Sequence, residues 1–167
     1  MKTIILPGYS PYNKDWAENI KAQLNLGHEV IVHYWRHWTS GSFILTYELK
    51  KIQEEIGKEK VNILAKSVGV YVALNLIPKI VYQVNKVVLC GIANIKGNEI
   101  RKLLNEVVSN ISGEKILCIQ NEKDKFVEYD EAREFYHSVN PNLKVISKPR
   151  QDHDYPYPEE FQEFLSS

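Results

Sequence analysis

The chain lacks long apolar runs and is poor in cysteine. None of its hydrophobic stretches approaches the roughly 18 consecutive apolar residues that a membrane-spanning helix requires. The apolar run within the first ten residues, MKTIILPGYS, is too short for a signal peptide. The two cysteines, Cys90 and Cys118, lie in strand-like segments, where buried and reduced thiols are expected. We therefore expect a cytoplasmic protein with no membrane partner.

The sequence also lacks an excess of either charge. Its 21 Lys and Arg residues balance 21 Asp and Glu residues, without a basic stripe, which argues against a nucleic-acid partner. No glycine-rich phosphate loop follows the first apolar segment, where residues 6–9 read LPGY, and this argues against a flavodoxin-like nucleotide binder. With 44% hydrophobic and 25% charged residues, the 167 residues predict one ordinary globular domain.

Short apolar runs alternate along the chain with segments of helical periodicity. The expected strands cover residues 3–6, 28–34, 61–64, 86–90, 115–119 and 143–147. Between them apolar residues recur three or four positions apart, which predicts helices. Near-continuous apolar strands alternating with helices predict an α/β fold, a doubly wound and mostly parallel six-stranded sheet with helices on both faces. In such sheets the chemistry collects at the carboxyl ends of the strands.

The segment around Ser67 has the pattern of a nucleophile elbow. A short apolar strand ends at Leu64, and an apolar helix follows from Val68 onwards. Small residues, Ala65 and Gly69, flank the serine so that strand and helix can meet at a sharp turn. By chance the pattern [GA]-x-S-x-G occurs in about one of eight chains of this length, so a serine that simply caps the helix is the alternative.

Two loop residues further along complete an arrangement that is suited to acyl transfer. Ser67 follows the third expected strand, Asp124 the fifth and His153 the sixth. A serine hydroxyl needs an adjacent base, histidine can take and return the proton, and a carboxylate fixes the histidine tautomer. We therefore predict Ser67 as the nucleophile, His153 as the base and Asp124 as its acidic partner.

The developing oxyanion of an acyl transfer requires preorganised N–H donors. The backbone N–H of Val68, at the start of the helix after Ser67, is one candidate. The second donor should come from the loop after the first strand, where Tyr9 is the best candidate.

Other residues compete for these roles. Glu122 and Asp130 are alternatives to Asp124 as the acid, and His137 also follows Asp124 but lies on a predicted helix. His33 and His37 are spaced for one face of a helix, yet their segment reads as a strand leaving into a loop. Neither a cysteine nor a carboxylate cluster joins them, so we predict no metal site and no cofactor.

The chain resembles the α/β-hydrolase family over nearly its whole length. The resemblance rests on the order Ser67, Asp124, His153, on the Asp-x-x-Val of residues 124–127, on Pro7-Gly8 and on Trp16. Within that family it is similar to small lidless serine hydrolases such as the retinoblastoma-binding-protein-9-like group. The resemblance implies a minimal fold with strand order 2-1-3-4-5-6 and no cap domain, because few residues separate the fourth strand from its helix.

The expected function is that of a serine hydrolase of the carboxylesterase type, which cleaves a small carboxylic ester or thioester through an acyl-enzyme. Without a lid the site should be shallow and open. Tyr12, Trp35 and Trp38 lie in loops of the active face and could form an aromatic wall for an apolar group, the alternative being ordinary packing at the rim. A non-catalytic, hydrolase-like binding module is the other interpretation of the chain.

Overall fold

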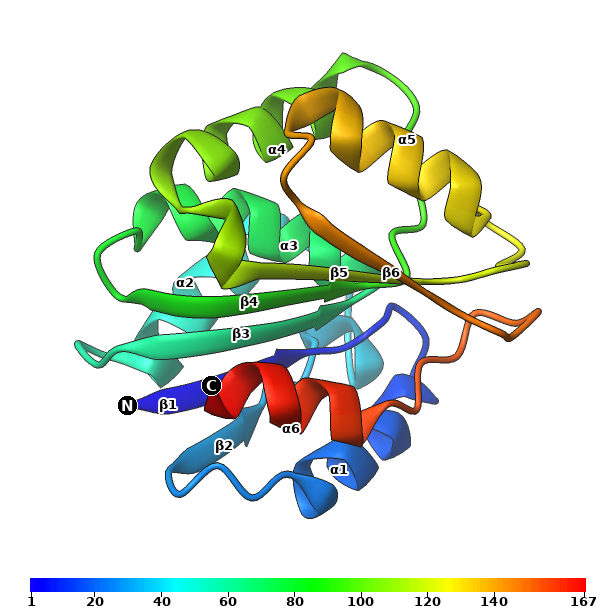
Figure 1. The fold of residues 1–167 in the computed structure, drawn as a ribbon. Coiled ribbons are helices and arrows are strands. Elements are labelled where there is room, and N and C mark those ends of the chain that lie inside the picture. The colour runs from blue at the N-terminus through cyan, green and yellow to red at the C-terminus, as the bar shows by residue number, and fades with distance from the viewer.

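A computed structural model describes residues 1–167 and shows strands and helices in alternation (Figure 1). The strands are β1 (Lys2–Leu6), β2 (Glu29–Val32), β3 (Val61–Lys66), β4 (Val84–Cys90), β5 (Ile116–Asn121) and β6 (Lys144–Lys148). The helices are α1 (Asn13–Gln23), α2 (Leu45–Ile56), α3 (Val68–Leu76), α4 (Asn98–Asn110), α5 (Tyr129–Val139) and α6 (Pro158–Ser166). Short 3-10 turns cover Arg36–Trp38, Ile77–Lys79 and Gly113–Lys115.

The six strands form one sheet in the order β2-β1-β3-β4-β5-β6. All five neighbouring pairs are parallel, so every carboxyl end lies at the same edge of the sheet. The predicted six-stranded, doubly wound sheet and its strand order are confirmed. From β1 the chain adds β2 on one side of the sheet, and from β3 it adds β4, β5 and β6 on the other side. The loops after β1 and β3 therefore lead away from each other and leave a crevice between them, which is where a site is expected.

The central strands bury both faces because consecutive side chains point to opposite sides of the sheet. In β3, Ile63 and Ala65 join a cluster of 31 buried residues on one face, whereas Leu64 joins a cluster of 14 on the other. Val87 and Val88 of β4 are divided between the two clusters in the same way. This double burial explains why the strands read in the sequence as continuous apolar runs.

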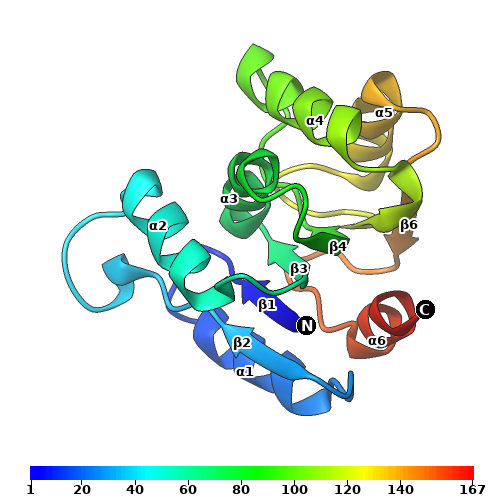
Figure 2. The same cartoon turned by 90° about the vertical axis from the view of Figure 1, so that its left-hand side faces the viewer.

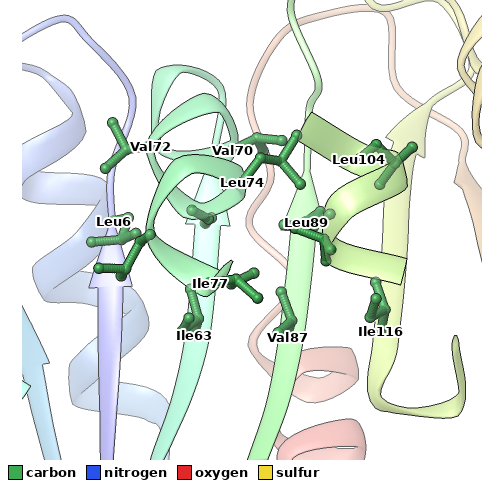
Figure 3. Close-up of a cluster of buried hydrophobic side chains, with 14 of the residues drawn as sticks. Leu6, Ile63, Val70, Val72, Leu74, Ile77, Val87, Leu89, Leu104 and Ile116 are labelled. Carbon is green, nitrogen blue, oxygen red and sulfur yellow. The ribbon is translucent and has the colours of Figure 1, made fainter. Parts of the chain in front are cut away.

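The helices cover the two faces unequally (Figure 2). The larger cluster takes its helical residues from α2, α3, α4 and α5, and the smaller cluster takes them from α1 and α6. Figure 3 shows α3 side chains such as Val70 and Leu74 packed over Leu89 of β4. The helix after Ser67 is therefore held at the centre of the larger core.

Every helix of the structure is too short or too polar to span a lipid bilayer.

Some element boundaries differ from those expected. Strand β4 begins at Val84, two residues before the expected start, since Val84 pairs with Val61 across a register shift in the ladder. The segment after β2 contains the 3-10 turn Arg36–Trp38, where a polar and aromatic loop was expected. Only residues 91–97 connect β4 with α4, a connection as short as the sequence predicts.

Candidate active site

Ser67 lies at the sharp turn between β3 and α3 with φ = 57° and ψ = −117°. It is the only residue other than glycine with a positive φ in the chain. For a residue with a Cβ this conformation is strained by about 1–3 kcal/mol, a cost that clusters at functional sites. The Ser67 side chain makes no capping hydrogen bond to α3, so capping does not explain the serine.

The backbone around Ser67 is held on both sides. Its N–H donates to the carbonyl of Cys90 at 3.1 Å, and its carbonyl accepts the N–H of Val70 at 2.9 Å. Gly69 allows the close approach of α3 to β1, because a Cβ at this position would lie 2.0 Å from the carbonyl oxygen of Leu6. The small residues predicted around the elbow thus allow strand and helix to meet there.

His153 and Asp124 form a hydrogen-bonded pair in the loops after β6 and β5. The His153 Nδ1 lies 2.6 Å from Asp124 Oδ2, and the Asp124 side chain is fully buried. Burial by itself would raise the pKa of Asp124, but hydrogen bonds from His153, Tyr155 and the backbone N–H of Phe126 outweigh it and hold this pKa below its usual value. Asp124 is therefore poised as a carboxylate that fixes the histidine ring.

The other ring nitrogen of His153 is free. Its Nε2 atom is buried and has no hydrogen-bond partner, although most buried polar atoms in folded proteins have one. No hydrogen bond joins this nitrogen to Ser67 in the structure. The ring is held from one side by Phe126, which packs edge-on at 4.6 Å between centroids, and from another by Tyr155 at 5.8 Å.

Tyr155 supports the pair through Asp124, a role that was not predicted for this loop aromatic residue. Its hydroxyl donates to Asp124 Oδ2 at 2.6 Å and accepts the backbone N–H of Asn121 at 3.1 Å. Gly91 leaves room for the ring, since a Cβ there would lie 2.5 Å from Tyr155. The only signal for this role in the sequence is the position of Tyr155 two residues after His153.

Ser67 opens onto a cavity of about 380 Å³. Tyr9, Val68 and Phe126 line this cavity together with Ser67. The rest of its wall comes from α3 and from the segment between β4 and the first turn of α4: Val70, Tyr71, Ile92, Ala93, Asn94, Lys96, Glu99 and Ile100. Most of these side chains are apolar, which suits an apolar group of a small ligand.

Both predicted oxyanion donors border this cavity. Val68 is the first residue of α3, where a backbone N–H has no acceptor within its own helix. The N–H of Tyr9 makes no hydrogen bond within the protein. Two residues with an unpaired backbone N–H therefore line the same cavity as Ser67.

The three aromatic residues predicted to line the pocket lie elsewhere. Tyr12 is exposed and borders a second cavity of about 570 Å³, which is lined mainly by α1 and does not include Ser67. Trp35 is only 1% exposed and belongs to the core. Trp38 contacts Tyr9 and does not line the cavity, and its indole N–H donates to the Tyr9 carbonyl at 2.8 Å. None of these three residues lines the cavity at Ser67, whereas Tyr71, Ile92 and Phe126 do.

The other histidines considered from the sequence do not contact Asp124. His137 lies on α5 and contacts the carbonyl of Leu143. His33 is buried between Glu48 and Glu55, with one carboxylate 2.8 Å from each ring nitrogen. His37 stacks on the ring of Tyr9, at 4.2 Å between centroids.

No protein-family model and no curated protein matches this sequence. Solved structures do match. Est1E from Butyrivibrio proteoclasticus, with ferulic acid bound, superposes with a TM-score of 0.72 at 15% identity, covering 99% of this chain and 86% of Est1E. XC6422 from Xanthomonas campestris, described as an α/β serine hydrolase without a lid, gives 0.69 at 12% identity over 98% of this chain and 78% of its own.

A bromoperoxidase from Bacillus anthracis gives a TM-score of 0.69 at 16% identity over 99% of this chain and 92% of that protein. At identities this low the agreement concerns the fold and leaves the chemistry to the residues of the site. The sheet order, the helices on both faces and these superpositions agree. The chain has the fold of the α/β hydrolases.

Proposed function

We propose that the protein is a serine hydrolase that cleaves small carboxylic esters through an acyl-enzyme. The observation that carries the proposal is the strained Ser67, whose side chain caps nothing and borders the apolar cavity. Esterases among the structural neighbours support it, as does the lidless hydrolase XC6422. Thioesters follow the same chemistry and belong to the same proposal.

In the first half of the reaction, the Ser67 hydroxyl attacks the ester carbonyl carbon and its proton passes to His153 Nε2. Asp124 keeps the ring in the tautomer that leaves Nε2 free to accept it. The negative charge that develops on the carbonyl oxygen accepts hydrogen bonds from the N–H groups of Tyr9 and Val68. The tetrahedral intermediate then collapses, and His153 returns the proton to the departing alcohol.

In the second half, a water molecule attacks the acyl-enzyme while His153 takes one of its protons. Collapse of the second tetrahedral intermediate releases the carboxylic acid and restores the Ser67 hydroxyl with the proton held by His153. The reaction consumes one ester and one water, and it yields one alcohol and one acid without a cofactor.

The finer grouping is part of the proposal. The connection of residues 91–97 leaves no room for a cap domain, and the cavity opens directly at the carboxyl edge of the sheet. Both features support a place among small lidless serine hydrolases such as the retinoblastoma-binding-protein-9-like group.

A non-catalytic module with a hydrolase fold is the second candidate. The observation that favours it is the absence of a hydrogen bond between Ser67 and His153. Catalytic hydrogen bonds are often long in the absence of substrate and tighten only in the complex, so this observation does not outweigh the strained serine.

Turnover of p-nitrophenyl acetate and butyrate separates the two candidates. A hydrolase should lose about 10³-fold or more in kcat in each of the variants Ser67→Ala and His153→Ala, because the residues of a triad act as a unit. Asp130→Asn is the matched control, since this carboxylate lies on the surface of α5. A His153→Ala variant that folds and retains more than about a tenth of the wild-type rate would refute the assignment of the base.

A further inference from the structure

The peptide unit between Gly8 and Tyr9 carries the loop donor of the proposed oxyanion hole. Its N–H end is unpaired and belongs to Tyr9, a residue that lines the cavity. Its carbonyl end belongs to Gly8 and accepts the indole N–H of Trp35 at 3.1 Å. A peptide unit is planar and trans, so its N–H and C=O point in opposite directions. Whatever holds the Gly8 carbonyl therefore also sets the direction of the Tyr9 N–H.

Trp35 is itself a rigid donor. Its side chain is 1% exposed, and its ring packs edge-on against His33 at 4.7 Å and against Phe43 at 5.6 Å. His33 is fixed in turn by carboxylates at both ring nitrogens. The same indole N–H also lies 3.2 Å from the carbonyl of Pro7, so it bridges the two peptide units that precede Tyr9.

The following peptide unit is held from the same segment. The Tyr9 carbonyl accepts hydrogen bonds from His37 Nε2 and Trp38 Nε1, each at 2.8 Å. Three consecutive peptide units of the loop are thus bound by side chains from residues 35–38. Trp35 alone reaches the unit that carries the Tyr9 N–H.

We propose that Trp35 is a positioning residue of the oxyanion hole, whose indole N–H fixes the Gly8–Tyr9 peptide unit with the Tyr9 N–H directed at the substrate oxygen. Donation to the Gly8 carbonyl also polarises the amide and strengthens its N–H as a donor. This inference rests on the proposed function. Trp35 would then stabilise the transition state through the Tyr9 N–H, whereas a residue that only packs would stabilise the folded protein.

The substitution Trp35→Phe tests this role because it keeps an aromatic ring in the core and removes the N–H. We expect kcat for p-nitrophenyl acetate to fall about 10- to 100-fold with little change in KM. A displaced Tyr9 N–H would bind the oxyanion of the transition state less well, whereas it contributes little to binding of the ester itself. The inhibition constant of an alkylboronic acid, which forms a tetrahedral adduct on Ser67, should rise by a similar factor. A residue that only packs would not weaken a tetrahedral adduct selectively.

The matched control is Tyr129→Phe. The Tyr129 hydroxyl also donates to a main-chain carbonyl, that of Val145 at 3.3 Å, and this substitution likewise keeps an aromatic ring while it removes the donor, but Tyr129 lies at the start of α5 and does not line the cavity at Ser67. Its kcat and its boronic acid inhibition constant should change by less than about threefold. If Trp35→Phe does not fold, benzothienylalanine in place of Trp35 gives the same comparison, because sulfur replaces the N–H in a ring system of nearly equal shape.

The outcomes distinguish this inference from the proposed function. If the wild type turns over esters and Ser67→Ala does not, while Trp35→Phe keeps the wild-type kcat and inhibition constant, the role of Trp35 is refuted and the hydrolase stands. A loss of kcat with an unchanged boronic acid constant would also refute it, as would an equal loss in Tyr129→Phe. If the wild type shows no turnover, the proposed function fails and the role of Trp35 fails with it.

Discussion

The backbone strain at Ser67 makes a prediction about stability. At φ = 57° and ψ = −117° the Cβ of residue 67 is unfavourable, and glycine removes that penalty. Ser67→Gly should therefore be more stable than Ser67→Ala by about 1 kcal/mol, even though glycine also makes the unfolded chain more flexible. Urea unfolding of the two variants measures the difference, and both should be inactive. A Ser67→Gly protein less stable than Ser67→Ala would show that the turn is not strained.

Asp124 should contribute to the pH dependence of stability. Its pKa is lower in the folded protein than the value of about 4 in an unfolded chain. The stabilisation is therefore complete above about pH 4 and is lost as the pH falls through the lower folded pKa. Between pH 7 and pH 3 the wild type should lose more thermal stability than Asp124→Asn, which has no carboxylate to protonate. Equal losses in the two proteins would contradict the hydrogen-bonded carboxylate.

The contact between α3 and β1 depends on Gly69. A Cβ there would lie 2.0 Å from the Leu6 carbonyl oxygen, and backbone atoms cannot yield as a flexible side chain can. Gly69→Ala should lower the free energy of unfolding by about 1–3 kcal/mol, as overpacked cores do, and should reduce esterase activity because α3 carries the N–H of Val68. At Gly113 the nearest atom to a Cβ would be 3.5 Å away, so Gly113→Ala serves as the control.

The two Gly-to-Ala proteins are compared by thermal unfolding and by kcat. The control should keep both values close to those of the wild type, because Gly113 lies outside the elbow in a 3-10 turn before β5. Similar behaviour of the two variants would show that the approach of α3 to β1 tolerates a methyl group and is not a requirement of the site.

The strands were predictable from the sequence, whereas their ends and some turns were not. The apolar part of β4, for example, is recognisable in the sequence as a continuous apolar run because both faces of the sheet are buried. Val84 was not recognised as the start of that strand because polar Asn85 separates it from the expected strand, which begins at Lys86. The 3-10 turn at Arg36–Trp38 is too short to show a periodicity in the sequence. His37 and Trp38 of this turn donate hydrogen bonds to the carbonyl of Tyr9, which lies far away in the sequence.

The sequence indicated the chemistry of the candidate site better than its walls. The positions of Asp124 and His153 follow from strand ends, and the structure brings these two side chains together. Trp35 was expected at the substrate because loop aromatics gather near such sites, but burial depends on how residues 35–43 fold back over the core. Phe126 and Ile100 reach the cavity only through the packing of their loops and helices against the sheet.

The size of the cavity predicts the size of the substrate. A volume of about 380 Å³ lies near the lower end for small-molecule sites, so acetyl and butyryl esters should be cleaved with a higher kcat/KM than octanoyl esters. Ala93→Leu narrows the wall and should reduce the rate for butyrate more than for acetate. Gln23→Leu changes the other cavity and is the control. A wild-type preference for octanoyl esters would contradict the small site.

Covalent labelling of Ser67 tests the acyl-enzyme most directly. A fluorophosphonate probe reacts with a serine that an adjacent base activates, and the adduct stays on the Oγ atom. Intact mass should show one adduct on the wild type, and peptide mapping should place it on Ser67. The folded variants Ser67→Ala and His153→Ala should remain unlabelled under the same conditions. An unlabelled wild type, or an adduct elsewhere than Ser67, would contradict nucleophilic catalysis by this residue.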